Sequence, residues 1–160
     1  METQPRIVDK PEIILVGMVY YGDPAGNEFG KNWDRFFKYA PLISSRVNEG
    51  QSYGLEFYTE DLEKDHKWFY MSAFETSSLD AIPLELVGKR LPACKYAVFT
   101  VKGGIKNIGD TFMYAYGTWI PNSAYQVAHR YDFELYEEGR FMGTEAEESE
   151  IDLYIPIKEK

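Results

Sequence analysis

Two short segments of this chain place a glutamate two positions before a tyrosine. Residues 55–60 read Leu-Glu-Phe-Tyr-Thr-Glu, and residues 133–138 read Phe-Glu-Leu-Tyr-Glu-Glu. Alternate residues of a β-strand share a face, so in each strand the glutamate would lie beside the tyrosine. A carboxylate beside an aromatic ring could receive a cation or an electron-poor aromatic compound. Either segment alone would also fit an ordinary solvated strand face. The two pairs are Glu56 with Tyr58 and Glu134 with Tyr136.

The similarity extends to the segments that should position these pairs. Residues 31–40 and residues 106–115 have Lys, Asn, Phe, Tyr and Ala in the same register. Apolar residues in both segments recur at helical spacing, which predicts two amphipathic helices. The apolar stripes are Trp33, Phe36, Phe37 and Ala40 in the first helix and Ile108, Phe112, Ala115 and Trp119 in the second.

Strand patterns flank both predicted helices, so each half reads strand, helix, strand, strand. The flanking patterns are residues 13–21, 55–60 and 69–72 in the first half and 96–102, 133–138 and 153–156 in the second. Because a helix and a half-sheet each need one face covered, we expect one α+β domain over residues 1–160. It would consist of duplicated βαββ units, about 10–80 and 88–158, with pseudo-two-fold symmetry. An antiparallel sheet would carry the two main helices on one face.

The predicted strands alternate between apolar residues and a mixture of rings and acids. If the helices cover the apolar face, the core receives Leu55, Phe57, Phe133, Leu135, Ile151, Leu153 and Ile155. The opposite face then carries Glu56, Tyr58, Tyr70, Glu134, Tyr136, Asp152 and Tyr154, with Trp68 as a neighbour. A sheet face lined by aromatic rings and a few acids predicts a small-molecule site. The assignment depends on a period of two and would invert with a bulge.

Composition and charge restrict the classes of partner. The formal net charge is −9, which disfavours nucleic-acid binding and favours the attraction of cations. No apolar run approaches the length of a membrane span and no secretory signal is evident, so we expect a cytoplasmic protein without a membrane partner. His66, His129 and Cys94 lack ligand-like spacing, so neither a metal nor a cofactor is expected. Cys94 fits a small buried residue better than a nucleophile.

Four segments of the second half, taken in order, resemble a known family. They are the strand 96–103 that ends in a glycine pair, residues 119–125 reading Trp-Ile-Pro-Asn-Ser-Ala-Tyr, residues 132–136 reading Asp-Phe-Glu-Leu-Tyr, and the strand 151–158. The layout resembles the GyrI-like small-molecule-binding domain, which is also the effector-binding half of AraC-type and MerR-type multidrug regulators. The first half matches more loosely, through residues 13–22 and 53–58.

The resemblance implies that Glu134 is the central acid at the base of a pocket, where aromatic rings sandwich a lipophilic, often cationic compound. The ligand-binding residues that we expect are Glu134, Tyr136, Tyr154, Glu56, Tyr58, Tyr70, Trp68 and Trp119. Trp119 also fits core packing, because it belongs to a helical stripe. The regulators carry a separate helix-turn-helix domain, whereas this chain begins almost directly with its first predicted strand. We therefore expect a stand-alone form that does not bind nucleic acid directly.

Three functions remain open at this point. The first is the binding of lipophilic aromatic or cationic small molecules, for drug or toxin sensing or for sequestration. The resemblance also implies a hydrolase of electrophilic cyclopropane-bearing genotoxins, with Glu134 as general base and Tyr136 or Tyr154 as proton donor. The third is an accessory or inhibitor protein that binds another protein through the exposed sheet face. The same face could also form a homodimer interface.

Overall fold

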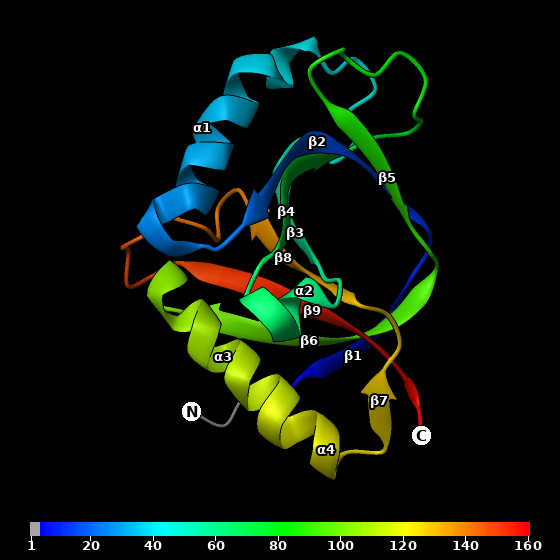
Figure 1. Ribbon diagram of the computed structural model, residues 1–160, viewed down its shortest axis with the longest axis vertical. Helices are drawn as coiled ribbons and strands as arrows, with labels where there is room; N and C mark the ends of the chain where they lie inside the picture. Colours follow the sequence, from blue (N-terminus) through cyan, green and yellow to red (C-terminus); the bar gives the residue numbers. More distant parts are fainter. Residues whose placement is uncertain (1–3) are drawn as a thin grey trace. The chain divides into compact units, whose positions relative to one another are not determined.

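The computed structural model describes residues 4–160, which form two compact units. The N-terminal unit is Pro11–Ala93, and the C-terminal unit joins Cys94–Lys160 to the segment that ends at Lys10. Each unit combines antiparallel strands with helices, so the architecture is α+β as predicted (Figure 1). No helix in the described part of the chain is long and apolar enough to cross a membrane.

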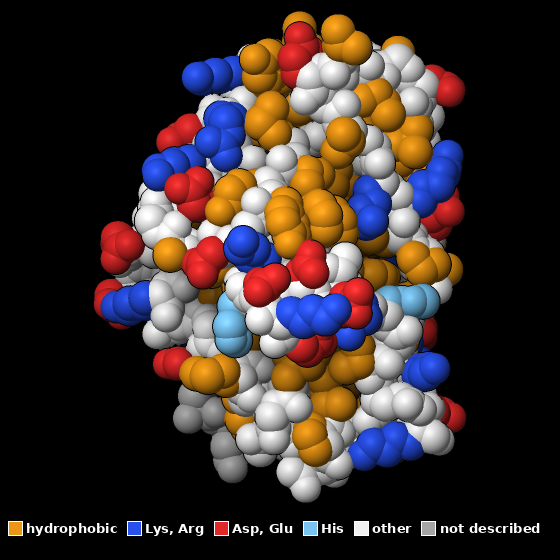
Figure 2. Space-filling view, viewed as in Figure 1, with side chains coloured by type: hydrophobic (Ala, Val, Ile, Leu, Met, Phe, Trp, Pro, Cys, Tyr) orange, Lys and Arg blue, Asp and Glu red, His pale blue; other side chains and the backbone are white. Residues whose placement is uncertain are grey.

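The N-terminal unit contains four strands and one long helix. Antiparallel pairing gives the strand order β3-β4-β2-β5. The strands are β2 (Ile13–Gly22), β3 (Gln51–Phe57), β4 (Trp68–Glu75) and β5 (Val87–Leu91), and the helices are α1 (Glu28–Tyr39), α2 (Asp61–Asp65) and the 3-10 turns Ala25–Asn27 and Ala40–Leu42. The short helix α2 buries none of its residues, and Figure 2 shows acidic and basic side chains together in its region.

The C-terminal unit has the strand order β1-β6-β9-β8, and β7 pairs with the end of β9. The strands are β1 (Arg6–Lys10), β6 (Cys94–Lys102), β7 (Tyr125–Val127), β8 (Tyr131–Glu137) and β9 (Glu150–Glu159). The helical elements are the 3-10 turn Ile105–Asn107, α3 (Ile108–Tyr114), a π-helical turn Ala115–Trp119 and α4 (Ile120–Asn122), which Figure 1 shows as one continuous run. Gly103 and Gly104 lead into this run with φ of 86° and 85°, a conformation that glycine adopts without strain.

The two units repeat the same order of elements, which confirms the predicted duplication. In each unit a strand, a helix and two long strands follow one another, with the short strand β7 added before β8 in the C-terminal unit, and the last of these long strands pairs between the other two. Strands β2, β3 and β4 therefore correspond to β6, β8 and β9. The sequence pattern does not predict β1 and β5. These strands add to β6 and β2 by pairings between residues far apart in the chain, which no local pattern specifies.

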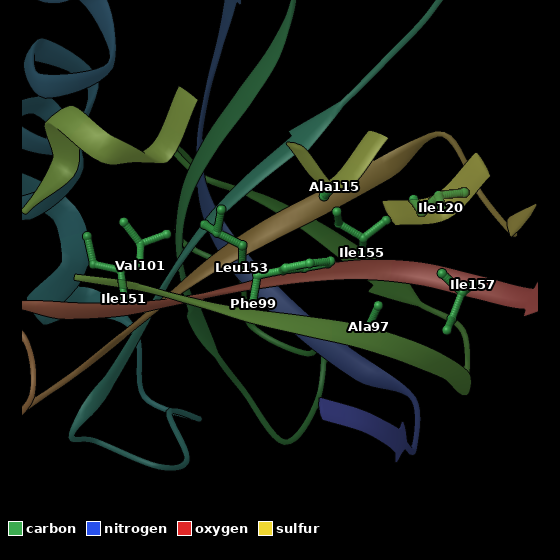
Figure 3. Close-up of a cluster of buried hydrophobic side chains, with 9 residues drawn as sticks. All are labelled: Ala97, Phe99, Val101, Ala115, Ile120, Ile151, Leu153, Ile155 and Ile157. Carbon is green, nitrogen blue, oxygen red and sulfur yellow. The ribbon is translucent and has the colours of Figure 1, made fainter. Parts of the chain in front are cut away.

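The core of the C-terminal unit lies between its sheet and its helical run. Figure 3 shows the buried side chains, which come from β6, β9 and the helical run: Ala97, Phe99, Val101, Ala115, Ile120, Ile151, Leu153, Ile155 and Ile157. Ile108, Phe112 and Trp119 pack against this cluster, so the predicted second helical stripe is confirmed. Each fully buried Leu or Ile contributes about 1.5–3 kcal/mol through the hydrophobic effect.

In the N-terminal unit, α1 packs on the sheet through both apolar and polar contacts. Phe36 is fully buried and meets Phe74 edge-on at 4.9 Å between ring centroids. The buried Asn32 donates hydrogen bonds to the Met18 carbonyl at 2.9 Å and to Ser72 Oγ at 3.0 Å. Phe37 was predicted in the same stripe, but it is 53% exposed. Each residue advances a helix by about 100°, which turns Phe37 away from the sheet.

The predicted distribution of residues between sheet faces is wrong for β3 and β8, and also for Tyr70 of β4. Glu134 pairs with Leu153, and paired residues share a face, so Glu134 lies on the face that the helical run covers. Glu56 pairs with Tyr70, which α1 contacts through Trp33. Both glutamates therefore lie on the helix-covered face of their own sheets. The alternation itself is correct, but which set of residues meets the helix depends on strand register, which is not local.

Candidate functional site

Glu134 is a buried carboxylate in the middle of β8. It is 4% exposed and accepts a hydrogen bond from the Tyr136 hydroxyl at 2.6 Å. The Tyr136 ring packs against the C-terminal hydrophobic cluster and meets Phe141 edge-on at 4.9 Å. Leu153 lies beside Glu134 on the neighbouring strand. Because this side chain is buried away from water, its attraction to a cation would be much stronger than in water.

A second buried acid lies on the same face of β8. Asp132 is fully buried, two positions before Glu134, and accepts a hydrogen bond from the Tyr116 hydroxyl at 2.7 Å. Tyr116 belongs to the π-helical turn, a kind of irregularity that is frequent at functional sites. Neither Asp132 nor Tyr116 was among the site residues predicted from the sequence. The period of two that begins at Glu134 was the signal that could have found Asp132.

Trp119, from the same π-helical turn, makes core contacts. Its ring meets Phe99 edge-on at 5.6 Å and stacks with Tyr125 at 6.1 Å. Trp119 remains partly exposed. It lies on the same side of the sheet as Glu134, since Phe99 and Glu134 both flank Leu153 across the strands. The packing role of Trp119 is therefore observed, and a role in ligand binding is a proposal.

The N-terminal unit contains its own cluster of rings around an acid. Glu56 is 6% exposed, and its Oε2 atom accepts hydrogen bonds from Trp68 Nε1 at 2.6 Å and from the Tyr58 hydroxyl at 3.4 Å. The Tyr58 and Trp68 rings lie 6.2 Å apart. Tyr70 is the cross-strand neighbour of Glu56. The structure thus brings together the four predicted site residues of the first half.

Helix α1 adds two rings that the sequence analysis did not assign to a site. Trp33 donates its indole N–H to the Tyr70 hydroxyl at 2.9 Å. Phe29 stacks on Tyr70 at 4.0 Å between centroids and meets Trp68 edge-on at 6.0 Å. Phe29 and Trp33 are four residues apart, so they lie on one face of the helix. That spacing was the available signal for both residues.

Tyr154 and Asp152 lie on the other face of the C-terminal sheet. Tyr154 pairs with Phe133 and stacks on its ring at 4.6 Å, so the predicted proximity of Tyr154 to Glu134 on one face is wrong. The register places Glu134 opposite Leu153, and side chains on adjacent positions of a strand point to opposite faces. Asp152 forms ion pairs with Arg140 at 2.7 Å and Arg6 at 3.0 Å.

Other groups considered in the sequence have ordinary surroundings. Cys94 is partly buried, and burial raises the pKa of its thiol, which disfavours the reactive thiolate at neutral pH. His66 and His129 are exposed. Within residues 4–160, no group of three or more His, Cys, Asp or Glu side chains is placed to hold a metal ion.

Comparison with known sequences identifies relatives over nearly the whole chain. A model of the GyrI-like small molecule binding domain matches residues 3–158. The transcriptional regulator BrlR of Pseudomonas aeruginosa is 33% identical over 152 residues, which cover 95% of this chain and 54% of BrlR. The chain therefore spans about half the length of this regulator.

Solved structures show the same fold. The structure of SAV2435 bound to tetraphenylphosphonium has a TM-score of 0.74 and 21% identity, and the match covers 98% of this chain and 94% of that one. A hydrolase encoded by lin2189 from Listeria innocua has a TM-score of 0.60 and 13% identity, with 97% and 92% covered. At these identities the likeness concerns the fold.

Proposed function

Because the chain belongs to the GyrI-like small-molecule-binding family, we propose that it binds lipophilic aromatic or cationic compounds with Glu134 as the central acid. The observation that carries the proposal is the buried Glu134 carboxylate, 2.6 Å from the Tyr136 hydroxyl and beside Leu153 of the neighbouring strand. A negative charge removed from water favours a ligand that brings a positive charge with little hydration. Drug or toxin sensing, or sequestration, is the biological role that we infer.

The ligand class follows from the rings that accompany the acid. In the C-terminal unit these rings are Tyr136, Phe141 and Trp119. A cation over an aromatic face gains about 0.5–2 kcal/mol per ring, depending on how far both are removed from water. SAV2435 is named as bound to tetraphenylphosphonium, a lipophilic cation with aromatic groups, which supports the same class for this chain.

The Glu56 cluster is a second candidate element, with a different role. Both Trp68 and Tyr58 donate to a single oxygen of Glu56, so we assign Glu56 the positioning of these two rings. Trp68 and Tyr70 are the rings of this cluster that we propose as ligand contacts. Replacing Glu56 by Gln keeps a carbonyl oxygen that can accept the Trp68 bond. The positioning role therefore predicts a smaller loss of affinity for Glu56→Gln than for Glu134→Gln.

Titration with tetraphenylphosphonium, followed by tryptophan fluorescence, tests the proposal. We expect saturable binding to the wild type and a loss of about tenfold or more in Glu134→Gln, the range for a charge-assisted contact. Glu138→Gln is the matched control, because Glu138 is exposed and lies four residues further along the chain. Wild-type affinity in Glu134→Gln would contradict the role of Glu134, and an equal loss in Glu138→Gln would reduce it to net charge.

A hydrolase is the second candidate function, favoured by the pairing of an acid and a phenol. With an electrophilic cyclopropane, water would bond to a ring carbon while Glu134 takes its proton and the strained C–C bond breaks. The released electron pair would pass to the conjugated acceptor of the substrate, which Tyr136 would protonate. The Glu134–Tyr136 hydrogen bond at 2.6 Å places the two groups together. Mass spectrometry of a cyclopropane-bearing compound with catalytic amounts of enzyme decides the matter, since only hydrolysis adds one water.

A further inference from the structure

The C-terminal unit has a polar cleft that the proposed function does not use. The cleft has a volume of about 380 Å³, and Arg6, Thr100, Lys102, Arg140, Asp152 and Tyr154 line it together with two glutamates. Thr100 and Asp152 are cross-strand neighbours. They lie on the sheet face opposite to Glu134, because Glu134 pairs with Leu153 and not with Asp152. The cleft is therefore separate from the Glu134 cluster.

Asp152 forms the floor of this cleft, and its carboxylate is fully used. One oxygen accepts hydrogen bonds from Thr100 Oγ1 at 2.7 Å and Arg140 Nη2 at 3.1 Å. The other accepts from Arg140 Nη1 at 2.7 Å and Arg6 Nη2 at 3.0 Å. A carboxylate offers about four acceptor positions, so Asp152 has none left for a ligand.

The two glutamates of the cleft are also turned towards Arg140. Glu150 Oε2 accepts from Arg140 Nε at 3.4 Å and Nη2 at 3.2 Å. Glu137 Oε1 accepts from Arg140 Nη1 at 3.4 Å. All five N–H donors of Arg140 are thus used on Asp152 and the two glutamates, so Arg140 has none left for a ligand.

Hydrogen-bond donors are in surplus at the same place. Arg6 has five N–H donors, of which one is used, on Asp152, and its side chain is 58% exposed. Lys102 contacts Glu150 at 3.4 Å, and its side chain is 72% exposed. Among residues 4–160 the Tyr154 hydroxyl has no hydrogen-bond partner. Burial, and to a lesser extent the charge of Asp152, raise the pKa of Tyr154, so its hydroxyl remains a donor at neutral pH. What this set lacks is an acceptor.

We propose that the cleft binds a small oxyanion, a carboxylate or a phosphate group, between the Arg6 guanidinium and the Lys102 ammonium. The planar fork of a guanidinium matches two oxygens of such a group, and the Tyr154 hydroxyl supplies a further donor. Lys10, 4.9 Å above the Tyr154 ring, adds positive charge beside the cleft. This positive charge would be confined to the cleft, since the chain as a whole carries a net charge of −9.

Isothermal titration of the full chain with inorganic phosphate, and separately with acetate, at low chloride concentration tests this proposal. We expect saturable binding of at least one of these ions, and the ion bound more tightly shows which group the cleft prefers. Arg6→Gln should weaken the binding about tenfold, the effect of losing a charge-assisted hydrogen bond. Lys102→Gln should weaken it as well. Glu134→Gln should leave it unchanged, which separates this site from the proposed function.

Two controls keep the result decisive. Lys158→Gln removes the same charge from an exposed position of β9 outside the cleft, and should bind as the wild type does. Arg6→Lys keeps the charge but loses the planar fork, so it should bind more tightly than Arg6→Gln and more weakly than the wild type. Absence of saturable binding of both ions to the wild type would overturn the proposal. So would an equal loss of binding in Lys158→Gln and Arg6→Gln.

Discussion

Replacement of Asp152 by Asn should destabilise the protein, because it removes the charge of a buried, fully hydrogen-bonded carboxylate. Asp152 is 1% exposed and receives four hydrogen bonds, two of them from Arg140 and one from Arg6. Hydrogen bonds from Arg140 and Thr100 outweigh the burial that opposes its ionisation, so its pKa is lowered. The neutral amide in Asn keeps the shape of the side chain but loses the charge and one acceptor oxygen.

The size of the effect follows from the burial of the partners. Removing one partner of a buried ion pair costs about 3–5 kcal/mol. The Arg140 side chain is 33% exposed and that of Arg6 is 58% exposed, so water replaces part of what is lost. We therefore expect a loss of roughly 2–3 kcal/mol in the free energy of unfolding. Urea denaturation followed by circular dichroism measures this difference.

The same variant has a defined pH dependence. Because the pKa of Asp152 is lowered in the folded protein, its contribution is fully present above the unfolded value of about 3.9 and disappears as the pH falls through the folded value. The stability difference between wild type and Asp152→Asn should be constant near neutral pH and shrink below about pH 4.

A matched control is Asp9→Asn, because Asp9 forms an exposed ion pair with Lys95 at 3.1 Å. Exposed pairs contribute about 0–1 kcal/mol, so this variant should remain close to the wild type. The reasoning about the ion-pair network would be refuted if Asp152→Asn were as stable as Asp9→Asn. It would also be refuted if the stability deficit of Asp152→Asn persisted unchanged at about pH 2–3, below the unfolded carboxyl pKa of about 3.9.

Three further predictions concern packing and titration. Gly17→Ala should destabilise the folded protein by about 2 kcal/mol or more, because the added Cβ would overlap the Ser72 carbonyl and approach Ala73 Cβ at 2.7 Å. Gly109→Ala, with open space around its Cβ, should instead stabilise it by about 0.5–1 kcal/mol. Thermal unfolding compares the two variants. Leu153→Ala should lower the free energy of unfolding by about 2–5 kcal/mol, as chemical denaturation measures, since Leu153 is fully buried. Leu84→Ala, at a 96% exposed position, should be nearly neutral. Equal effects of the two changes would contradict the assigned core. Burial raises the pKa of Tyr131 to about 12. The wild type should therefore lose stability as the pH rises from about 10, the pKa of an unfolded tyrosine, to about 12. Tyr131→Phe should lose less stability over this range, which alkaline unfolding curves measure.

The local pairing of acid and tyrosine could be predicted from the sequence, because it depends only on the two-residue period of a strand. Tyr136 does donate to Glu134 and Tyr58 to Glu56, at 2.6 and 3.4 Å. The duplicated order of strands and helix was predictable for the same reason, since the residues that define each element lie within one short segment. Phe37 shows the limit, because a single position in a helix decides between burial and exposure.

Other features depend on relations between distant parts of the chain. Tyr154 lies on the opposite face from Glu134 because of the register between β8 and β9, which no pattern within either strand determines. The pairing of β1 with β6 joins residues about ninety positions apart, and it brings Arg6 to Asp152. Arg140 was overlooked although it is a basic residue between Glu137 and the acidic stretch that ends at Glu150. A lone cation in an acidic segment is the signal that could have revealed the network.

The charge selectivity of binding tests the role of Glu134 most directly. Dissociation constants of the cation tetraphenylphosphonium and of the neutral triphenylphosphine oxide, which has similar rings, should be measured for the wild type and for Glu134→Gln. We predict that the variant loses about tenfold or more in affinity for the cation and about twofold or less for the neutral compound. Equal losses for both compounds, or no loss for the cation, would contradict the account.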